Sequence, residues 1–376
     1  MEKYDFIIVG AGLFGCTCAR LLTDNGFKCL VIEKNDYVGG LCNTSVINDV
    51  VIHNTSAHIF RTDDKNIWDF VNKYDEFIYP ATMSISCMNN NKLYHFPFDL
   101  STMSLTNNIY TPKNCLKQIK EDTKIYSSQN CSNLEEKCIS EYGFEIYNKC
   151  IKGYTEKVYG RECKLLSPFL YEKYPMNYGY LSRISTQKYI GVPRNGYTKL
   201  CENILGDDID IILKKEFIND YENISKLGKY IIYSGPIDKF CKYIYGVLDW
   251  CTLKFSVKKE NLEGISKYGS SLIYWNDKDN LLVAITEDQL LQDNFNNDFT
   301  YITYGYEDTW NINKECMFCI NNDQTEEILD KYIEFTKENF SNMIFGGRCG
   351  LYRNLSMDET IGIAFEICNS IIKQLK

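Results

Sequence analysis

A glycine-rich turn near the N-terminus has the spacing of a phosphate-binding turn. Gly10-Ala11-Gly12-Leu13-Phe14-Gly15 reads GxGxxG and follows the apolar run 6–9. Glycines at this spacing permit a tight turn and a close backbone approach to a pyrophosphate, and the free N–H groups of a following helix favour its charge. Glu33 ends the next apolar run, at the distance expected of a carboxylate that accepts from a ribose hydroxyl. The sequence therefore predicts a bound adenine dinucleotide.

Two further glycine pairs favour FAD over NAD as this dinucleotide. Gly39-Gly40 follows Glu33 closely, where FAD-binding folds place a second glycine pair near the phosphates. Gly346-Gly347-Arg348, followed by Asp358-Glu359-Thr360, lies at an expected strand, turn and helix near the C-terminus. A C-terminal segment that comes back to the N-terminal unit suits a contact with the flavin end of FAD, and NAD-binding domains seldom need such a contact.

Apolar runs and helical spacing indicate the elements that position these residues. We expect buried parallel strands at 6–9, 29–32, 229–233 and 343–345. We expect helices at 14–25, 65–74 and 357–375. Residues 112–175 look mainly helical, residues 243–320 alternate as in an antiparallel sheet, and residues 176–197 predict a polar, mobile segment.

The order of these elements predicts an α/β fold with two insertions. A discontinuous FAD-binding Rossmann-like domain is expected at 1–80, 190–242 and 321–376. A helical domain is expected at 101–189, and an antiparallel β-sheet domain at 81–100 and 243–320. The last strand and helix thereby return to the N-terminal unit.

Composition excludes several classes of protein. The chain has 376 residues, 44% hydrophobic and 24% charged, which excludes global disorder. Its net charge of −9 gives no general basic footprint for nucleic acid. The 17 cysteines are scattered, and the lone CxxC at Cys316 to Cys319 has no second pair, so we expect free thiols and no metal site. With no apolar run long enough to span a membrane and no signal peptide, a cytoplasmic protein is expected.

Motifs over nearly the whole chain resemble the UDP-galactopyranose mutase family. They are Gly10 to Gly15, Glu33-Lys34 with Gly39-Gly40, Ala57-His58-Ile59-Phe60 with Trp68, Lys152-Gly153-Tyr154-Thr155, Gly191-Val192-Pro193 with Gly196-Tyr197-Thr198-Lys199-Leu200, Tyr233-Ser234-Gly235-Pro236-Ile237-Asp238, Tyr245-Gly246, and Gly347-Arg348-Cys349-Gly350-Leu351-Tyr352-Arg353 with Met357-Asp358.

The resemblance implies a redox-neutral isomerisation of UDP-galactopyranose to UDP-galactofuranose. Reduced FAD would act as the nucleophile at the anomeric carbon and expel UDP, which returns after the ring has reclosed. The implied partners are a nucleotide-sugar substrate, NAD(P)H or another reductant, and a second copy of the chain in a homodimer.

The resemblance also assigns residues to the site. Implied catalytic residues are His58, Arg61 and Tyr352. Implied cofactor-binding residues are Gly10, Gly12, Leu13, Phe14, Glu33, Lys34, Gly39, Gly40, Leu41, Asn43, His58, Ile59, Phe217, Gly235, Gly347, Arg348, Tyr352, Met357 and Asp358. Implied substrate-binding residues are Tyr154, Tyr159, Asn177, Arg183, Arg194 and Tyr352.

The chain departs from the family pattern on the substrate side. The family segment Gly-Pro-His-Ile-Phe-His is Ser56-Ala57-His58-Ile59-Phe60-Arg61 here, and relatives with Arg at the last place accept 2-acetamido sugars, so UDP-N-acetylgalactosamine is a candidate substrate. Asn177 and Ala284 stand where the family has diphosphate-binding arginines, and Ile184 stands for a family Tyr. Arg183 and Arg194 are the candidates to compensate for the lost arginines.

Two other functions stay open from the sequence. The same fold hosts flavin oxidoreductases, so net oxidation of a substrate is one alternative. A catalytically inactive FAD-binding relative is the other, because the cofactor motifs are kept while the substrate motifs change.

Overall fold

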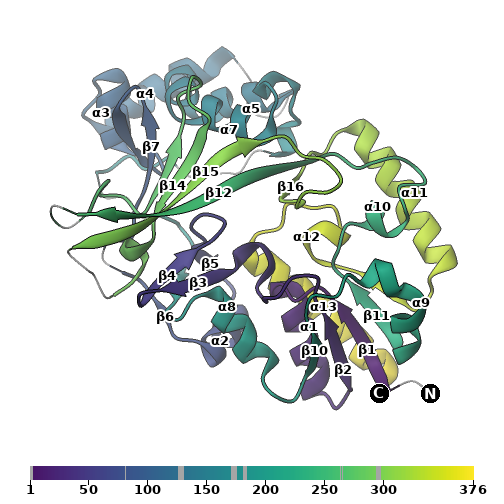
Figure 1. The fold of residues 1–376 in the computed structure, drawn as a ribbon. Helices are drawn as coiled ribbons and strands as arrows, with labels where there is room; N and C mark the ends of the chain where they lie inside the picture. Colours follow the sequence, from purple (N-terminus) through teal and green to yellow (C-terminus); the bar gives the residue numbers. More distant parts are fainter. Residues whose placement is uncertain are drawn as a thin grey trace.

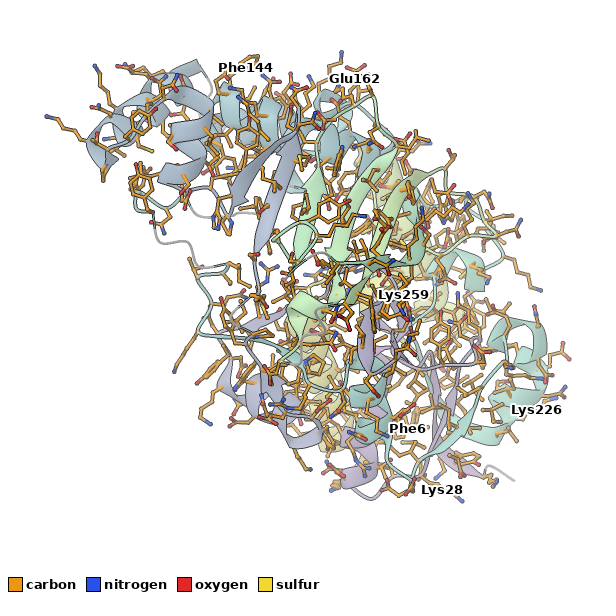
Figure 2. The ribbon with its side chains drawn as sticks, turned by 60° about the vertical axis from the view of Figure 1, so that its left-hand side comes forward. Phe6, Lys28, Phe144, Glu162, Lys226 and Lys259 are labelled. Carbon is orange, nitrogen blue, oxygen red and sulfur yellow. The ribbon has the colours of Figure 1, made fainter. Side chains whose placement is uncertain are left out.

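The computed structural model describes residues 3–80, 82–125, 131–170, 176–180, 184–262, 264, 266–293 and 298–376. A parallel sheet with its helices lies at one end, a group of helices lies at the other, and a long twisted sheet lies between them (Figure 1). Figure 2 shows the same order in a second view, with Phe144 and Glu162 at the helical end, Lys259 in the middle, and Phe6 and Lys28 at the other end.

The parallel sheet has five strands in the order β10-β2-β1-β11-β17. They are β10 (Asp210–Ile212), β2 (Cys29–Ile32), β1 (Tyr4–Val9), β11 (Gly228–Tyr233) and β17 (Met343–Phe345), and all four pairings are parallel. Four strands confirm the expected apolar runs. The short edge strand β10 carries no such run, because its three residues are exposed, and it escaped prediction.

Helices cover both faces of this sheet. On one face α1 (Leu13–Asp24), α8 (Tyr197–Leu205), α2 (Lys65–Tyr74) and α13 (Met357–Leu375) share one apolar core with the sheet. α13 packs along α1, which confirms the expected return of the C-terminus. The expected helices at 65–74 and 357–375 have those bounds in the structure.

On the other face lie α9 (Tyr221–Ile224), α10 (Ile237–Phe240) and α11 (Asp323–Asn339), with α12 (Gly347–Gly350) in the turn after β17. No helix was expected over the range of α11. Its local signal was present, because Asn322 caps the helix and shares a capping box with Thr325.

The second sheet has seven strands in the order β16-β12-β15-β14-β13-β7-β8. Its strands are β7 (Ile85–Asn89), β8 (Lys92–Phe96), β12 (Trp250–Asn261), β13 (Leu272–Trp275), β14 (Leu282–Glu287), β15 (Phe299–Asp308) and β16 (Phe318–Cys319). The pairings are antiparallel except that β7 and β13 run parallel. The expected antiparallel sheet is therefore confirmed, with one parallel junction.

The helical part packs against one end of this sheet (Figure 1). It consists of α3 (Leu100–Asn107), α4 (Pro112–Asp122), α5 (Leu134–Tyr142), α6 (Phe144–Ile146), a π-helical segment (Tyr147–Ile151) and α7 (Lys152–Tyr159). Between residues 112 and 170, the described part is mainly helical, as expected. None of the helices among the described residues has both the length and the apolar character needed to cross a membrane.

Two small sheets link the large ones. β3 (Thr44–Ile47) and β4 (Val50–His53) form a hairpin, and β5 (Phe60–Thr62), β9 (Tyr189–Pro193) and β6 (Phe77–Ile78) form a three-stranded sheet. β9 corrects the expectation of a mobile segment up to Pro193. Its backbone is paired on both sides by strands more than one hundred residues earlier, which no local pattern could show.

Candidate cofactor site

A cavity of about 550 Å³ lies at the carboxyl ends of β1, β2 and β11. In open parallel sheets this edge is where ligands bind. Sixteen of the nineteen expected cofactor residues line it: Gly10, Gly12, Leu13, Phe14, Glu33, Lys34, Gly39, Gly40, Leu41, Asn43, His58, Phe217, Gly235, Gly347, Arg348 and Met357. The structure therefore brings together residues from the N-terminal, middle and C-terminal parts of the chain.

The glycine turn leaves no room for side chains and presents backbone N–H groups to the cavity. Gly10 has φ +97°, and a Cβ there would lie 2.2 Å from the Ser234 hydroxyl. A Cβ on Gly15 would lie 1.9 Å from the Gly10 carbonyl oxygen. Gly12 caps α1 without any side-chain hydrogen bond, so the first N–H groups of the helix are free for an anion. This cradle fits a dinucleotide pyrophosphate.

Glu33 stands at the cavity wall where β2 ends. Its carboxylate accepts the Ala11 N–H at 2.7 Å and the Asn35 N–H at 2.8 Å, and the residue is 5% exposed. These bonds orient the carboxylate, and its remaining lone pairs can accept from ribose hydroxyls.

One wall comes from the segment between β15 and β16, and the sequence analysis missed it. Residues 309–317, here termed the strap, leave the seven-stranded sheet and cross to the parallel-sheet end, where Glu315 pairs with Lys34 at 2.6 Å. The indole Nε1 of Trp310 is buried, and the described residues offer it no hydrogen-bond partner. Other atoms of Trp310 line the cavity.

Arg348 ties the strap to α12. Its guanidinium donates to the Met317 carbonyl at 2.9 Å and to the Leu355 carbonyl at 2.6 Å, and it lies over the Phe318 ring. The side chain lines the cavity, so Arg348 both holds the strap and brings a positive charge to the site. Nothing in the local sequence of the strap signals this contact, which depends on the path of the sheet.

His58 borders the cavity from the loop between β4 and β5. Its Nδ1 lies 2.9 Å from the Ser56 carbonyl oxygen, and its own carbonyl accepts from the Tyr197 hydroxyl at 3.0 Å. Desolvation lowers the pKa of His58 to about 4, so the imidazole is neutral at pH 7. The neutral ring, with its proton on Nδ1, leaves Nε2 as an acceptor.

Three expected cofactor residues do not line the cavity. Tyr352 is fully buried, and its hydroxyl lies within hydrogen-bond distance of the carbonyl oxygens of Asp249 at 2.6 Å and Ile320 at 3.0 Å. This corrects the expectation that Tyr352 is a catalytic, cofactor-binding and substrate-binding residue. Ile59 packs against the apolar core of the seven-stranded sheet instead. Asp358 lies in the first turn of α13 and accepts from the Ser356 hydroxyl at 2.6 Å.

The expected substrate residues do not gather at this cavity. Arg194 pairs with Glu76 at 2.9 Å and with Asp293 at 2.6 Å, which corrects its expected role as a free diphosphate ligand. Asn177 is exposed and accepts the Gly179 N–H through its own side chain. Arg61 lies on β5 opposite Ile190, outside the cavity lining. Arg183 lies outside the described residues.

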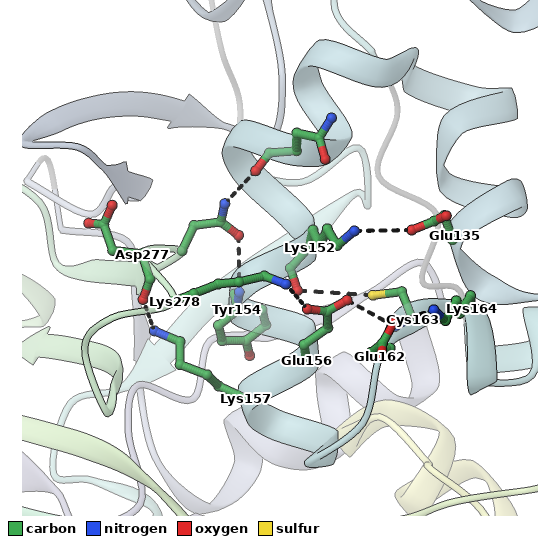
Figure 3. A network of polar contacts seen from close by, with 12 residues as sticks. Glu135, Lys152, Tyr154, Glu156, Lys157, Glu162, Cys163, Lys164, Asp277 and Lys278 are labelled. Atoms are coloured by element: carbon green, nitrogen blue, oxygen red, sulfur yellow. Dashed lines mark hydrogen bonds and ion pairs between the residues drawn. The ribbon is translucent and has the colours of Figure 1, made fainter.

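Tyr154 and Tyr159 lie on α7, where the helical part meets the sheet. The Tyr154 ring packs 4.5 Å from the Tyr274 ring, and its N–H donates to the Asn276 side chain. Figure 3 shows this junction, in which the Lys157 ammonium reaches the backbone of Asp277. The two tyrosines therefore face the sheet rather than the cavity, and a nucleotide contact by them stays a prediction.

The comparisons with known proteins decide the family. The family model described as UDP-galactopyranose mutase matches residues 149–354, more than half of the chain. The chain belongs to the UDP-galactopyranose mutase family. A second model, an NAD(P)-binding Rossmann-like domain, matches residues 8–74, which include the glycine turn. Membership confirms the resemblance seen in the sequence and places the chain among the sugar mutases, which are isomerases.

Relatives of this mutase-family chain match over their whole length. A probable UDP-galactopyranose mutase of Klebsiella pneumoniae is 28% identical over 100% of this chain and 96% of that protein. A dTDP-fucopyranose mutase of Escherichia coli is 27% identical over 98% of this chain and 99% of that protein. A crystal structure of reduced UDP-galactopyranose mutase superposes with a TM-score of 0.74 at 13% identity, covering 100% of this chain and 95% of that one, which confirms the fold.

Proposed function

We propose that this protein is a flavin-dependent mutase that interconverts the pyranose and furanose forms of a nucleotide-linked sugar, with FAD in the cavity at the edge of the parallel sheet. The observation that carries the proposal is the cavity lining, which joins the glycine turn, Glu33 and Arg348 around one space in a chain of the mutase family.

The residues present fit FAD as the cofactor. The N-terminus of α1 and Gly39-Gly40 would hold the pyrophosphate, and Glu33 would accept from the adenosine ribose. Reduced FAD supplies a nucleophilic flavin nitrogen when bound. A nicotinamide or another donor would supply the electrons.

His58 is the side chain best placed to act beside the cofactor. It is neutral at pH 7 and its Nε2 is free of the Ser56 contact, so it can accept a hydrogen bond or a proton at that atom. Phe217 and Leu13 add apolar area to the cavity wall.

The substrate is proposed only as a class, a hexose linked to a pyrimidine nucleoside diphosphate. Ile184 and Ala284, which replace a family tyrosine and arginine, are 3% and 4% exposed and belong to one apolar cluster. The diphosphate therefore finds its positive partners elsewhere in this chain. The relatives are named for UDP-galactopyranose and dTDP-fucopyranose, so both nucleotides belong in the test.

The test is anaerobic turnover by the purified, dithionite-reduced protein. UDP-galactose, UDP-N-acetylgalactosamine and dTDP-fucose are incubated in turn, and the pyranose and furanose forms are separated by chromatography. A furanose product from any of them supports the proposal and names the sugar.

Two outcomes would overturn the proposal. In a parallel aerobic assay without dithionite, formation of peroxide or consumption of added nicotinamide in proportion to substrate would indicate a flavin oxidoreductase. Absence of product, with no effect of any of the three ligands on the melting temperature, would indicate an FAD-binding relative without mutase activity.

A further inference from the structure

The loop that carries His58 is held from two sides, by the parallel-sheet part through the Tyr197 hydroxyl and by the seven-stranded sheet through Thr286. We propose that Thr286 of β14 is a positioning residue, whose hydroxyl holds the turn at Ser56 and Ala57 so that His58 keeps its ring fixed at the cofactor cavity. This proposal rests on the proposed function for its catalytic meaning, but its structural part can be measured separately.

The first step is the orientation of the His58 ring. The Ser56 carbonyl can only accept, so the 2.9 Å contact with Nδ1 requires the proton on that nitrogen. The ring orientation and its tautomer therefore depend on where the Ser56 carbonyl points. Any rotation of the turn at Ser56 would move that acceptor away and free the ring.

The second step is the conformation of Ser56 itself. Its φ is +75°, in the left-handed region that a residue with a Cβ enters only at a cost. Such a conformation persists where surrounding contacts determine it. Ser56 therefore needs an external partner to keep its carbonyl toward His58.

Thr286 is that partner. Its Oγ1 accepts the Ala57 N–H at 2.9 Å and pairs with the Ser56 hydroxyl at 3.1 Å. The residue is fully buried, and its strand is paired on both sides, with Leu272 of β13 and Thr303 of β15 as its neighbours. The hydroxyl is thus presented from a rigid part of the sheet.

A second contact from the same part of the chain secures the start of the loop. Asp288, which follows β14, accepts the His53 N–H at 2.8 Å and the Thr303 hydroxyl at 2.9 Å. The His58 N–H in turn points at His53 Nδ1, 3.4 Å away. With the start of the loop held at His53 and the Thr55 hydroxyl bonded to the Leu41 carbonyl, the Thr286 hydroxyl makes the direct contacts to the turn at Ser56 and Ala57.

The experiment compares Thr286→Val with Thr286→Ser, using nitrogen NMR of the three histidines and steady-state kinetics. Valine keeps the shape and removes the hydroxyl, whereas serine keeps the hydroxyl. Thr300→Val is the control, because Thr300 is also fully buried, on β15, and its hydroxyl donates within its own strand to the Tyr301 carbonyl. FAD-loaded protein is used throughout.

We expect Thr286→Val to convert the His58 signal from one Nδ1-protonated form to a mixture of tautomers, and to lower kcat on the order of tenfold with little change in KM. Thr286→Ser should restore both, and Thr300→Val should change neither. An unchanged His58 signal in folded Thr286→Val protein would overturn the proposal. If the valine variant does not fold, Ser56→Gly is the second variant. Glycine suits a φ of +75° and removes only the bond from the Ser56 hydroxyl, so His58 must keep its single tautomer because the bond from the Ala57 N–H to Thr286 remains. A mixture of tautomers in Ser56→Gly would overturn the role of the Ala57–Thr286 bond.

These outcomes separate this proposal from the proposed function. The NMR signal of His58 reports its position whether or not any sugar is turned over. Loss of the single tautomer in a protein that converts no nucleotide sugar would keep the positioning role and reject the mutase.

Discussion

Gly15 shows how tightly the phosphate-binding turn constrains a single residue. We expect Gly15→Ala to lower the free energy of unfolding by about 1–3 kcal/mol, because its methyl group would collide with the Gly10 carbonyl and the backbone must shift. The same shift should weaken FAD binding at least about tenfold, since a displaced helix N-terminus loses its hydrogen bonds to the phosphate. Urea unfolding and a fluorescence titration with FAD measure the two effects.

Gly26 provides the matched control for that substitution. It has φ +89° and open space where a Cβ would lie, so Gly26→Ala should cost only the strain of the left-handed backbone, about 1–2 kcal/mol. Its FAD affinity should equal that of the native protein. Equal FAD affinities in the Gly15 and Gly26 variants would contradict the assignment of the turn.

His53 and His58, whose side chains are desolvated, predict a loss of stability in acid. Burial lowers the pKa of His53 to about 3, and desolvation lowers that of His58 to about 4, so between these values and 6.5 the unfolded chain binds more protons than the folded chain. The free energy of unfolding should therefore be highest above about pH 6.5 and fall as the pH decreases, with a slope of up to about 1.4 kcal/mol per pH unit for each proton.

Urea unfolding at a series of pH values between neutral and mildly acidic measures this slope. His58→Gln should reduce the slope of the unfolding free energy against pH by the contribution of one proton, since glutamine does not titrate. A slope that is the same in the native and His58→Gln proteins would show that His58 is protonated equally in both states.

At the scale of elements, a buried lysine is one of the contacts that dock α7 on the sheet. The Lys157 ammonium donates to the carbonyl of Asp277 at 2.9 Å (Figure 3), and to those of Asn280 at 3.1 Å and Leu282, all around the turn between β13 and β14. Lys157→Met should destabilise the protein by at least about 2 kcal/mol, because buried carbonyls lose their partner.

Lys164→Met is the control for this helix contact. Lys164 is exposed and pairs only along the surface with Glu162, so its loss should leave the unfolding curve in urea unchanged. Equal effects of the two substitutions would show that the Lys157 ammonium does not stabilise the docking of α7.

The strap forms one wall of the cavity, and the ion pair between Glu315 of the strap and Lys34 lies at the surface. Both side chains are about half exposed, so the pair should contribute less than about 1 kcal/mol, or up to about a fivefold change in the Kd for FAD. We expect Glu315→Gln to raise that Kd at low salt and to have little effect at high salt, because salt screens the native pair.

The pair of Lys65 and Asp69 on α2 gives the matching control, since it is equally superficial and lies outside the cavity lining. Asp69→Asn should leave FAD affinity unchanged at both salt concentrations. A Glu315→Gln protein with native affinity at low salt would mean that the strap does not close over the cofactor.

At the scale of the whole molecule, the cavity exists only when the chain is folded. The residues that line it lie between Val9 and Thr360 in the sequence, and they include loops that connect strands of both large sheets. A ligand that binds only the folded state adds about 2.7 kcal/mol to its stability at one hundred times its Kd. The melting temperature should therefore rise with FAD concentration.

FMN is the control ligand, because it lacks the adenosine that Glu33 would hold. It should raise the melting temperature less than FAD at equal concentration, as scanning fluorimetry can measure. Equal shifts with the two flavins would show that the adenosine half of the cavity is not used.

Local sequence was enough to predict the parallel-sheet unit and the inner wall of the site. The strands at 6–9 and 29–32, the GxGxxG turn and Glu33 are signalled by neighbouring residues, because a buried strand and a glycine turn each require particular side chains over four to six positions. The family resemblance rested on these motifs together with others along the chain, as far as Met357-Asp358.

Long-range packing determined which distant side chains meet at the cavity. It brought the strap and Trp310 to the site, turned the Tyr352 hydroxyl inward to two carbonyls, and paired Arg194 with two carboxylates. β9 became a strand because β5 and β6 supply its hydrogen bonds. These outcomes depend on contacts between segments that are far apart in the chain, and the neighbouring residues in the sequence do not predict such contacts.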